Sequence, residues 1–120
     1  MDTKFWGKHL LIDCYGCDKK LISDKENIIK FLKQVVIDID MVAYGEPIVE
    51  HFATHDPEKG GYTAMQLIET SLIDGHFVDA TGAAYISVHS CKDFNEKDVL
   101  GAIVMYFYPV SYKTHTIYRK

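Results

Sequence analysis

The sequence has no long run of apolar residues, and this absence limits where the protein can act. None of its apolar stretches approaches the roughly 20 consecutive residues that a membrane-spanning helix needs. The first nine residues carry Asp2, Lys4 and Lys8 in place of the apolar centre of a secretion signal. We therefore expect a cytoplasmic protein with no membrane partner.

The sequence also lacks a large excess of one charge and an even number of cysteines. Lysine and arginine number 13 and the acidic residues 17, which leaves a net charge of −4 with both signs interspersed. Such a chain offers no electrostatic surface for nucleic acid or for an anionic membrane. The three cysteines, Cys14, Cys17 and Cys91, are an odd number and argue against a disulfide framework. Each is a candidate free thiol.

Internal repeats, low-complexity segments and linkers are absent as well, so residues 1–120 are expected to form a single domain. A domain of this length can form a core but not easily a deep cleft. A site shared between two copies is therefore a reasonable expectation. The segment HDPEKGG, residues 55–61, is a loop by composition. Without a G-K-[ST] sequence it is not a Walker loop.

Two helices are predicted from the residues that are present. Ser23 or Asp24 is a suitable cap for the first helix. After the cap, apolar residues recur at helical spacing and form one stripe: Ile28, Ile29, Leu32, Val35, Val36 and Ile39. The second helix is expected to run from Asn95 to Phe107 and to end before Pro109.

The remaining chain is rich in strand signals. We predict a buried strand within residues 8–17, a β-rich segment at 41–53, strands at 63–73, 77–78 and 83–90, and a last strand at 112–118. Asp74-Gly75 is predicted to form the turn after residues 63–73. Sequential hairpins give a mostly antiparallel sheet, so the predicted fold is an α+β two-layer sandwich with two helices on one face.

The most informative segment is ETSLIDGHFVDATGAAYISVHSC, residues 69–91. With a turn at residues 74–75, Ser71 ends one strand, His76 follows across the turn, and Cys91 ends another strand. Adjacent antiparallel strands would then bring a hydroxyl, an imidazole and a thiol to one end of the sheet. These groups suit the roles of nucleophile, acid or base, and proton donor.

The spacing of Ser71, His76 and Cys91 resembles the signature of the pyruvoyl-dependent S-adenosylmethionine decarboxylases of bacteria and archaea. Residues 7–18, GKHLLIDCYGCD, are similar to the opening strand of that family, which has a G-x-H-L start and a tyrosine and a cysteine near its end. The order of the elements is similar over almost the whole chain.

The resemblance implies a self-processing enzyme that supplies the aminopropyl donor for polyamine synthesis. The hydroxyl of Ser71 would attack the carbonyl of Thr70, and elimination from the resulting ester would cut the chain. The products would be residues 1–70 and a pyruvoyl-capped fragment 71–120. The pyruvoyl ketone would form a Schiff base with the substrate amine and act as an electron sink.

The resemblance also implies individual roles. His76 would be the processing base, Thr63 a hydroxyl that assists it, and Cys91 the donor that returns a proton to the substrate carbon. The family further implies a homodimer of processed protomers, with sites near the subunit contacts.

Several positions depart from the family pattern. The family usually has glutamate directly before the serine, where this chain has Thr70. Val78 stands where an aromatic residue often stacks on adenine, and Ala80 stands where an acidic residue contacts the substrate. Other side chains would have to supply those contacts. The predicted substrate-binding residues are Glu69, Thr63, Phe52 and Tyr62.

These departures leave two alternatives open. One is a pyruvoyl-dependent ornithine or arginine decarboxylase, because the same chemistry needs only an α-amino acid. The distal charge of that substrate would need a carboxylate such as Asp74, Asp79 or Glu69. The other alternative is a non-catalytic homologue that stays uncleaved and binds a partner subunit or a metabolite.

A zinc-binding module is a further alternative. Cys14-x-x-Cys17 and His51-x-x-x-His55 contain two thiols and two imidazoles, four ligands that suit a tetrahedral zinc ion. However, 33 residues separate Cys17 from His51, far more than in a zinc finger. No metal is therefore expected.

Overall fold

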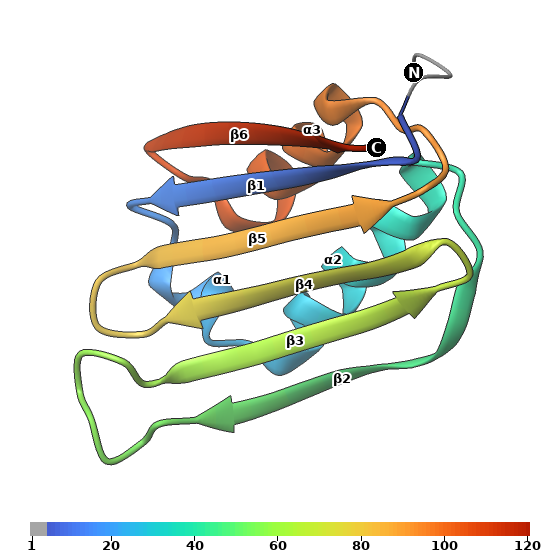
Figure 1. Ribbon diagram of the computed structural model, residues 1–120. Helices are drawn as coiled ribbons and strands as arrows, with labels where there is room; N and C mark the ends of the chain where they lie inside the picture. The colour runs from blue at the N-terminus through green and yellow to red at the C-terminus, as the bar shows by residue number, and fades with distance from the viewer. Residues whose placement is uncertain (1–4) are drawn as a thin grey trace.

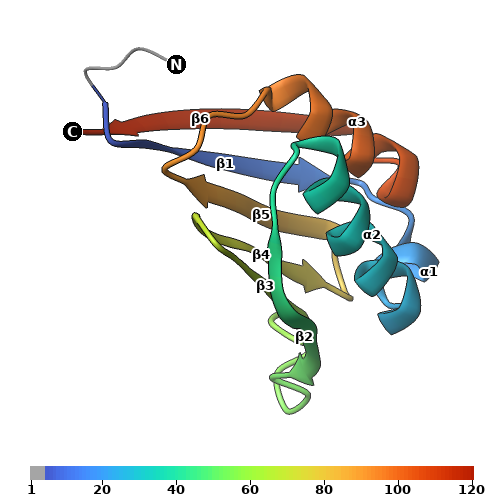
Figure 2. The same cartoon turned by 90° about the vertical axis from the view of Figure 1, so that its right-hand side faces the viewer.

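The computed structural model describes residues 5–120, and in this range three helices cover one face of a six-stranded sheet (Figures 1 and 2). The strands are β1 Gly7–Tyr15, β2 Ala43–Phe52, β3 Gly61–Ile68, β4 Ser71–Val78, β5 Ala83–Ser90 and β6 Ser111–Arg119. The helices are α1 Lys19–Ile22, α2 Lys25–Asp38 and α3 Glu96–Phe107. The predicted α+β two-layer sandwich is confirmed, with the short α1 added to the two expected helices.

The strands follow one another across the sheet in the order β2-β3-β4-β5-β1-β6, and every neighbouring pair is antiparallel. A single break in register occurs in β2, between Tyr44 and Ile48, where Gly45 and Pro47 interrupt regular pairing. Both edges of the sheet are therefore formed by strands far apart in the sequence, β2 and β6.

Capping and apolar periodicity explain why the helices form where they do. The Asp24 carboxylate accepts hydrogen bonds from the backbone N–H groups of Glu26 and Asn27 at 3.0 and 3.3 Å, so Asp24 is the cap of α2. The Asn95 side chain caps α3 in the same manner. The stripe on α2 faces the sheet. Phe31 of α2 packs against Phe107 of α3, with 4.7 Å between the ring centroids.

The core lies between the helices and the inner face of the sheet. Inward-facing residues of β1 such as Leu10 and Ile12 are completely buried, and so is Phe77 of β4. The other face of the sheet has no helix over it within the described residues (Figure 2). On that face Leu67 and Tyr85 are 42% and 44% exposed.

The predicted turn at Asp74-Gly75 is wrong. The chain turns at Glu69-Thr70 instead, so β4 begins at Ser71 and runs without a break through residues 74 and 75. Asp74 pairs in register with Ser87, whose hydroxyl donates to its carboxylate at 2.8 Å. A Cβ on Gly75 would lie 3.2 Å from the Phe77 ring, so a larger residue there would crowd that ring.

No helix within residues 5–120 is long and apolar enough to cross a membrane. Asp2 and Lys4, on which the expected absence of a secretion signal partly rests, lie outside the described residues.

Candidate functional site

The turn between β3 and β4 meets the end of β5 at one end of the sheet. Ser71 and Ser90 are register partners in β4 and β5. The next residue, Cys91, donates its backbone N–H to the carbonyl oxygen of Thr70 at 3.2 Å. Ser71 and Cys91 therefore lie together, as predicted. The carbonyl that Ser71 was predicted to attack is held by a hydrogen-bond donor.

Gly7 allows the chain to pass close to this corner. A Cβ on Gly7 would lie 2.8 Å from the carbonyl oxygen of Ser90 and 3.1 Å from the Cα of Cys91. Both neighbours are backbone atoms that cannot swing aside. The glycine that opens the G-x-H-L segment thus has a steric role beside Cys91.

His76 lies away from this corner, contrary to the prediction that all three residues meet. Ser71 and His76 belong to the same strand, and five residues of extended chain separate their Cα atoms by about 17 Å. The prediction failed because it placed a turn between them. A single chain brings Ser71 to Cys91 but does not bring His76 to either.

Thr63 and His76 form a pair at the opposite end of the strands. The hydroxyl of Thr63 lies 2.8 Å from Nδ1 of His76, and Nε2 lies 3.1 Å from the carbonyl oxygen of Lys59. Because a carbonyl oxygen only accepts, the neutral ring carries its proton on Nε2 and accepts from Thr63 at Nδ1. Thr63 therefore orients His76.

The predicted substrate-binding residues are divided between the two ends. Phe52 is 53% exposed at the end of β2, and Tyr62 packs edge-on against His51 with ring centroids 4.9 Å apart. Both lie at the same end as Thr63, on the strands β2 and β3. Glu69 is exposed in the β3–β4 turn, next to the corner of the sheet formed by Thr70, Ser71 and Cys91, called the Ser71 corner below.

An incompletely satisfied carboxylate follows β4. The Asp79 oxygen Oδ2 lies 2.7 Å from Nε2 of His51. Its other oxygen, Oδ1, is buried and has no hydrogen-bond partner among residues 5–120. Val78 beside it is 7% exposed. The Asp79 side chain as a whole is 37% exposed, so a rotation of the carboxylate would bring this unsatisfied oxygen to a donor group from a ligand.

Two stacked imidazoles lie on β1 and β5 near the Ser71 corner. His9 and His89 are register partners whose rings are 4.7 Å apart and almost parallel, and Trp6 approaches His89 edge-on. Nε2 of His89 is buried without a partner in the described chain. Burial, and then the charges of His9 and Arg119, lower the pKa of His89 below its ordinary value.

The four residues considered for zinc do not come together. Cys14 and Cys17 lie at the end of β1, whereas His51 lies on the edge strand β2, with β3, β4 and β5 between them. The hydrogen bond between the two thiols, together with burial, raises the pKa of Cys14, and the same contact lowers the pKa of Cys17. Within residues 5–120 no three His, Cys, Asp or Glu side chains form a cluster suited to a metal.

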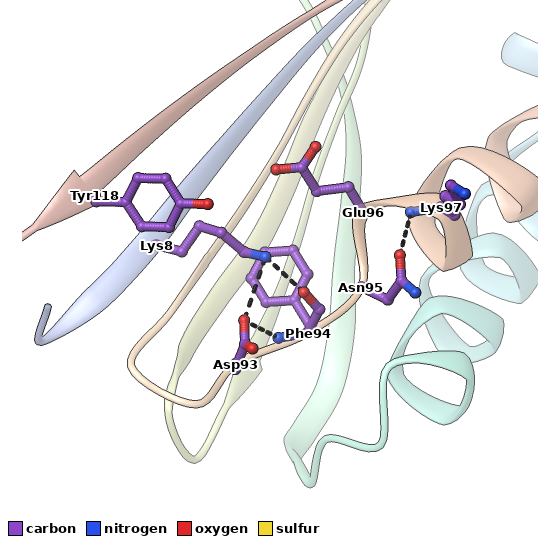
Figure 3. A pocket seen from close by; sticks show the side chains of 7 residues that line it. All are labelled: Lys8, Asp93, Phe94, Asn95, Glu96, Lys97 and Tyr118. Atoms are coloured by element: carbon purple, nitrogen blue, oxygen red, sulfur yellow. Dashed lines mark hydrogen bonds and ion pairs between the residues drawn. The ribbon is translucent and has the colours of Figure 1, made fainter. Parts of the chain in front are cut away.

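A pocket of about 460 Å³ lies between the start of α3 and the strands β1 and β6 (Figure 3). The Lys8 ammonium is buried there, 3.3 Å from the Asp93 carboxylate and 4.3 Å from the centre of the Phe94 ring. It also donates to the carbonyl oxygen of Phe94. Neither Ser71 nor Cys91 lines this pocket, which is distinct from the corner described above.

Sequence reasoning missed the residues that hold Thr70. The Ser90 hydroxyl, completely buried, lies 2.7 Å from the Thr70 hydroxyl. No motif in the sequence marks this serine. A correct turn at residues 69–70 would have been the useful signal, because it sets the register that pairs Ser71 with Ser90.

Comparison with known proteins points to one family. Residues 8–120 match the sequence model of a family described as S-adenosylmethionine decarboxylase. An S-adenosylmethionine decarboxylase proenzyme of Clostridium tetani is 28% identical over 87 residues, covering 72% of this chain and 64% of that protein. One from Synechococcus sp. strain WH7803 is 31% identical over 87 residues, covering 72% and 63%. The aligned part of the chain thus spans less than two thirds of the length of these relatives.

A solved structure has the same fold. The adenosylmethionine decarboxylase from Aquifex aeolicus matches 96% of this chain and 91% of its own, with a TM-score of 0.80 and 23% sequence identity. At that level of identity the likeness establishes the fold.

Proposed function

Because the chain belongs to the S-adenosylmethionine decarboxylase family, we propose that it cleaves itself between Thr70 and Ser71 and then decarboxylates S-adenosylmethionine. The observation that carries this proposal is the hydrogen bond from the Cys91 N–H to the carbonyl of Thr70, the residue directly before Ser71. The product would serve as an aminopropyl donor for polyamine synthesis.

Self-cleavage would begin with an acyl shift at Ser71. Its Oγ bonds to the carbonyl carbon of Thr70 and loses its proton, the C–N bond breaks, and the nitrogen gains a proton. The product is an ester. Negative charge develops on the Thr70 oxygen during the attack, where the Cys91 N–H lies at 3.2 Å. A positioned N–H of this kind stabilises an oxyanion.

The second stage removes the α-proton of Ser71 to a base and expels the Thr70 carboxylate. The remaining dehydroalanine takes up water and releases ammonia, which leaves a pyruvoyl group on the fragment 71–120. That group supplies an electron sink for breaking the carboxylate bond of the substrate. The Cys91 thiol would return a proton to the substrate. Its partial burial and its position one residue beyond the register partner of Ser71 support this role.

His76 is the proposed processing base, and its position supports a site shared by two copies. Imidazole titrates near neutral pH and can both take and return a proton. Two sheets packed face to face about a two-fold axis across the strands would set the start of β4 in one copy over its end in the other. Thr63 and His76 of one copy would then lie over the end of the sheet that carries Ser71 and Cys91 in its partner.

The uncovered face of the sheet is suited to such a contact. Leu67 and Tyr85 are 42% and 44% exposed on it, and Tyr85 is the register partner of His76. A second copy would remove this apolar surface from water. The proposed assembly is therefore a homodimer.

A second candidate substrate is a basic amino acid, ornithine or arginine. The observation that favours it is the buried Oδ1 of Asp79, which has no hydrogen-bond partner among the described residues. A distal ammonium or guanidinium group would satisfy that oxygen with a charge-assisted hydrogen bond. The neighbouring Val78 supplies no aromatic surface for adenine.

The intact mass of the purified protein under denaturing conditions tests the proposal. Two fragments, 1–70 and 71–120, with a blocked N-terminus on the second are expected. Ser71→Ala should remain one chain. The cleaved protein should then release carbon dioxide from carboxyl-labelled S-adenosylmethionine. Release of carbon dioxide from ornithine or arginine instead would assign the enzyme to that basic amino acid. A single full-length species in the wild type would favour a non-catalytic binding protein.

A further inference from the structure

Thr70 is held at two points by consecutive residues at the end of β5. Its carbonyl oxygen accepts the Cys91 N–H at 3.2 Å, and its hydroxyl lies 2.7 Å from the Ser90 hydroxyl. The oxygen of Ser90 also accepts the backbone N–H of Lys92 at 3.0 Å. Ser90 is completely buried, so its hydroxyl is fixed by this loop and by the sheet.

The sulfur of Met41 completes the set of acceptors around the two hydroxyls. It lies 3.4 Å from the Thr70 hydroxyl and 3.8 Å from the Ser90 hydroxyl. One hydroxyl can therefore donate to the other while the second donates to the sulfur, a weak acceptor. Both possible directions leave each hydroxyl with a partner, and neither group carries a charge.

We propose that the Thr70–Ser90 hydroxyl pair positions the scissile peptide for self-cleavage, an inference that rests on the proposed function above. The acyl shift requires the peptide plane between residues 70 and 71 to stay in place while the Ser71 oxygen approaches its carbonyl carbon. Threonine is restricted at χ1, so anchoring its hydroxyl also restrains its Cα. That restraint keeps the carbonyl oxygen on the Cys91 N–H.

Ser90 and the Thr70 side chain are positioning groups in this proposal, because they act on the peptide through their mutual hydrogen bond and take no part in bond making. Their contribution should therefore appear in the rate of cleavage. After cleavage the bond between residues 70 and 71 no longer exists, so the pair has no further part in decarboxylation by this proposal.

The test is the rate at which fragment 71–120 forms in freshly synthesised protein, followed by denaturing mass spectrometry. Thr70→Val keeps the branched shape without the hydroxyl, and Ser90→Ala removes the other hydroxyl. Each should slow cleavage by about tenfold, the effect of losing one well-placed hydrogen bond. The double variant should be no slower than the slower single variant, because both remove the same contact.

Two variants serve as controls. Thr70→Ser keeps the hydroxyl and should restore most of the rate. Ser87→Ala removes another buried hydroxyl of β5, one bonded to Asp74 at 2.8 Å, and should cleave at the wild-type rate. The midpoint of the pH profile of cleavage should stay unchanged in every variant, because neither hydroxyl titrates in the working range. Each substitution is also made in a Ser71→Ala chain, where the unfolding midpoint shows whether the fold is retained.

The outcomes separate this inference from the function on which it rests. Wild-type cleavage with Thr70→Val and Ser90→Ala at the same rate would overturn the positioning role alone. Independent, multiplying losses in the double variant would overturn the pairwise action. If Ser90→Ala does not fold, the two Thr70 variants test the positioning role. Slow cleavage in Thr70→Val with most of the rate restored in Thr70→Ser would support it, and equal rates would overturn it. A wild-type chain that never cleaves would overturn both proposals.

Discussion

Cys91 offers two different groups to the same corner of the sheet. Its backbone N–H contacts the Thr70 carbonyl, whereas its half-buried side chain carries a thiol. Substitution of the side chain leaves the backbone donor in place. The residue can therefore serve self-cleavage through its backbone and turnover through its side chain.

Cys91→Ala should accordingly cleave but turn over poorly. The proposed loss in carbon dioxide release is about 10² to 10⁴, the usual contribution of a positioned acid. Mass spectrometry measures cleavage and labelled substrate measures turnover in the same preparation. Full turnover in a completely cleaved Cys91→Ala protein would remove the thiol from the mechanism.

His89 makes stability depend on pH in a definite direction. Burial and the neighbouring charges of His9 and Arg119 lower its pKa in the folded state. Between the lowered value and the ordinary value near 6.5, the unfolded chain binds more protons than the folded chain, so the free energy of unfolding rises with pH. The stability associated with His89 is fully present above the pKa of the unfolded chain. It is lost as the pH falls toward the lower pKa of the folded chain.

Replacing His89 with Gln should therefore flatten the fall in stability as the pH drops below about 6.5. Urea unfolding at several pH values, in the uncleavable Ser71→Ala background, measures this slope. His115→Gln is a suitable control, because that ring is 59% exposed. An equal slope in the wild type and in His89→Gln would contradict the assignment.

At the scale of elements, the β3–β4 hairpin shows what the sequence could and could not predict. Apolar periodicity located both long helices and nearly all strands, because burial of one face leaves a clear pattern. It missed the turn, because Asp-Gly is a strong turn signal and Glu69-Thr70 is not. Packing against Phe77 and pairing with Ser87 explain the glycine and the aspartate instead. The error of a few residues misplaced His76.

Gly75→Ala tests the role of this glycine inside a strand. A Cβ would lie 3.2 and 3.3 Å from two ring atoms of Phe77 and 3.4 Å from Ile86, so overpacking should cost about 1–3 kcal/mol. Gly101→Ala in α3 is the matched control: no neighbouring atom lies within 4 Å of its Cβ, and it should stabilise by up to about 1 kcal/mol. Urea unfolding in the Ser71→Ala background compares them. Equal stability in the two variants would argue against the packing role.

At the scale of the whole molecule, one chain contains every proposed group but does not assemble them. Ser71 and His76 are about 17 Å apart along one strand, so no rotamer change can join them. Sequence spacing alone could not reveal this, because it records separation along the chain and not which copy supplies a group. The fold class was predictable from the sequence, whereas the proposed sharing of the site rests on the uncovered face of the sheet, which only the structure reveals.

Mixed dimers test that sharing. Ser71→Ala and His76→Ala chains should each stay uncleaved alone. When they are unfolded together and refolded, the His76→Ala chain should be cleaved, since its Ser71 would meet the intact His76 of its partner. Mass spectrometry distinguishes the two chains. If neither variant is cleaved in the mixture, Ser71 and His76 must act within one chain, and each copy must process itself. A monomer in sedimentation experiments would lead to the same conclusion.

The strand order β2-β3-β4-β5-β1-β6 has a consequence for the timing of events. Cleavage after Thr70 would leave β1, β2 and β3 on one fragment and β4, β5 and β6 on the other, with β1 inserted between β5 and β6. The two pieces would be interleaved in one sheet and could separate only by unfolding. Before cleavage the chain can refold by itself, and afterwards refolding requires two molecules to meet. Folding must therefore precede cleavage, and the cleaved protein would refold with difficulty after it has been unfolded.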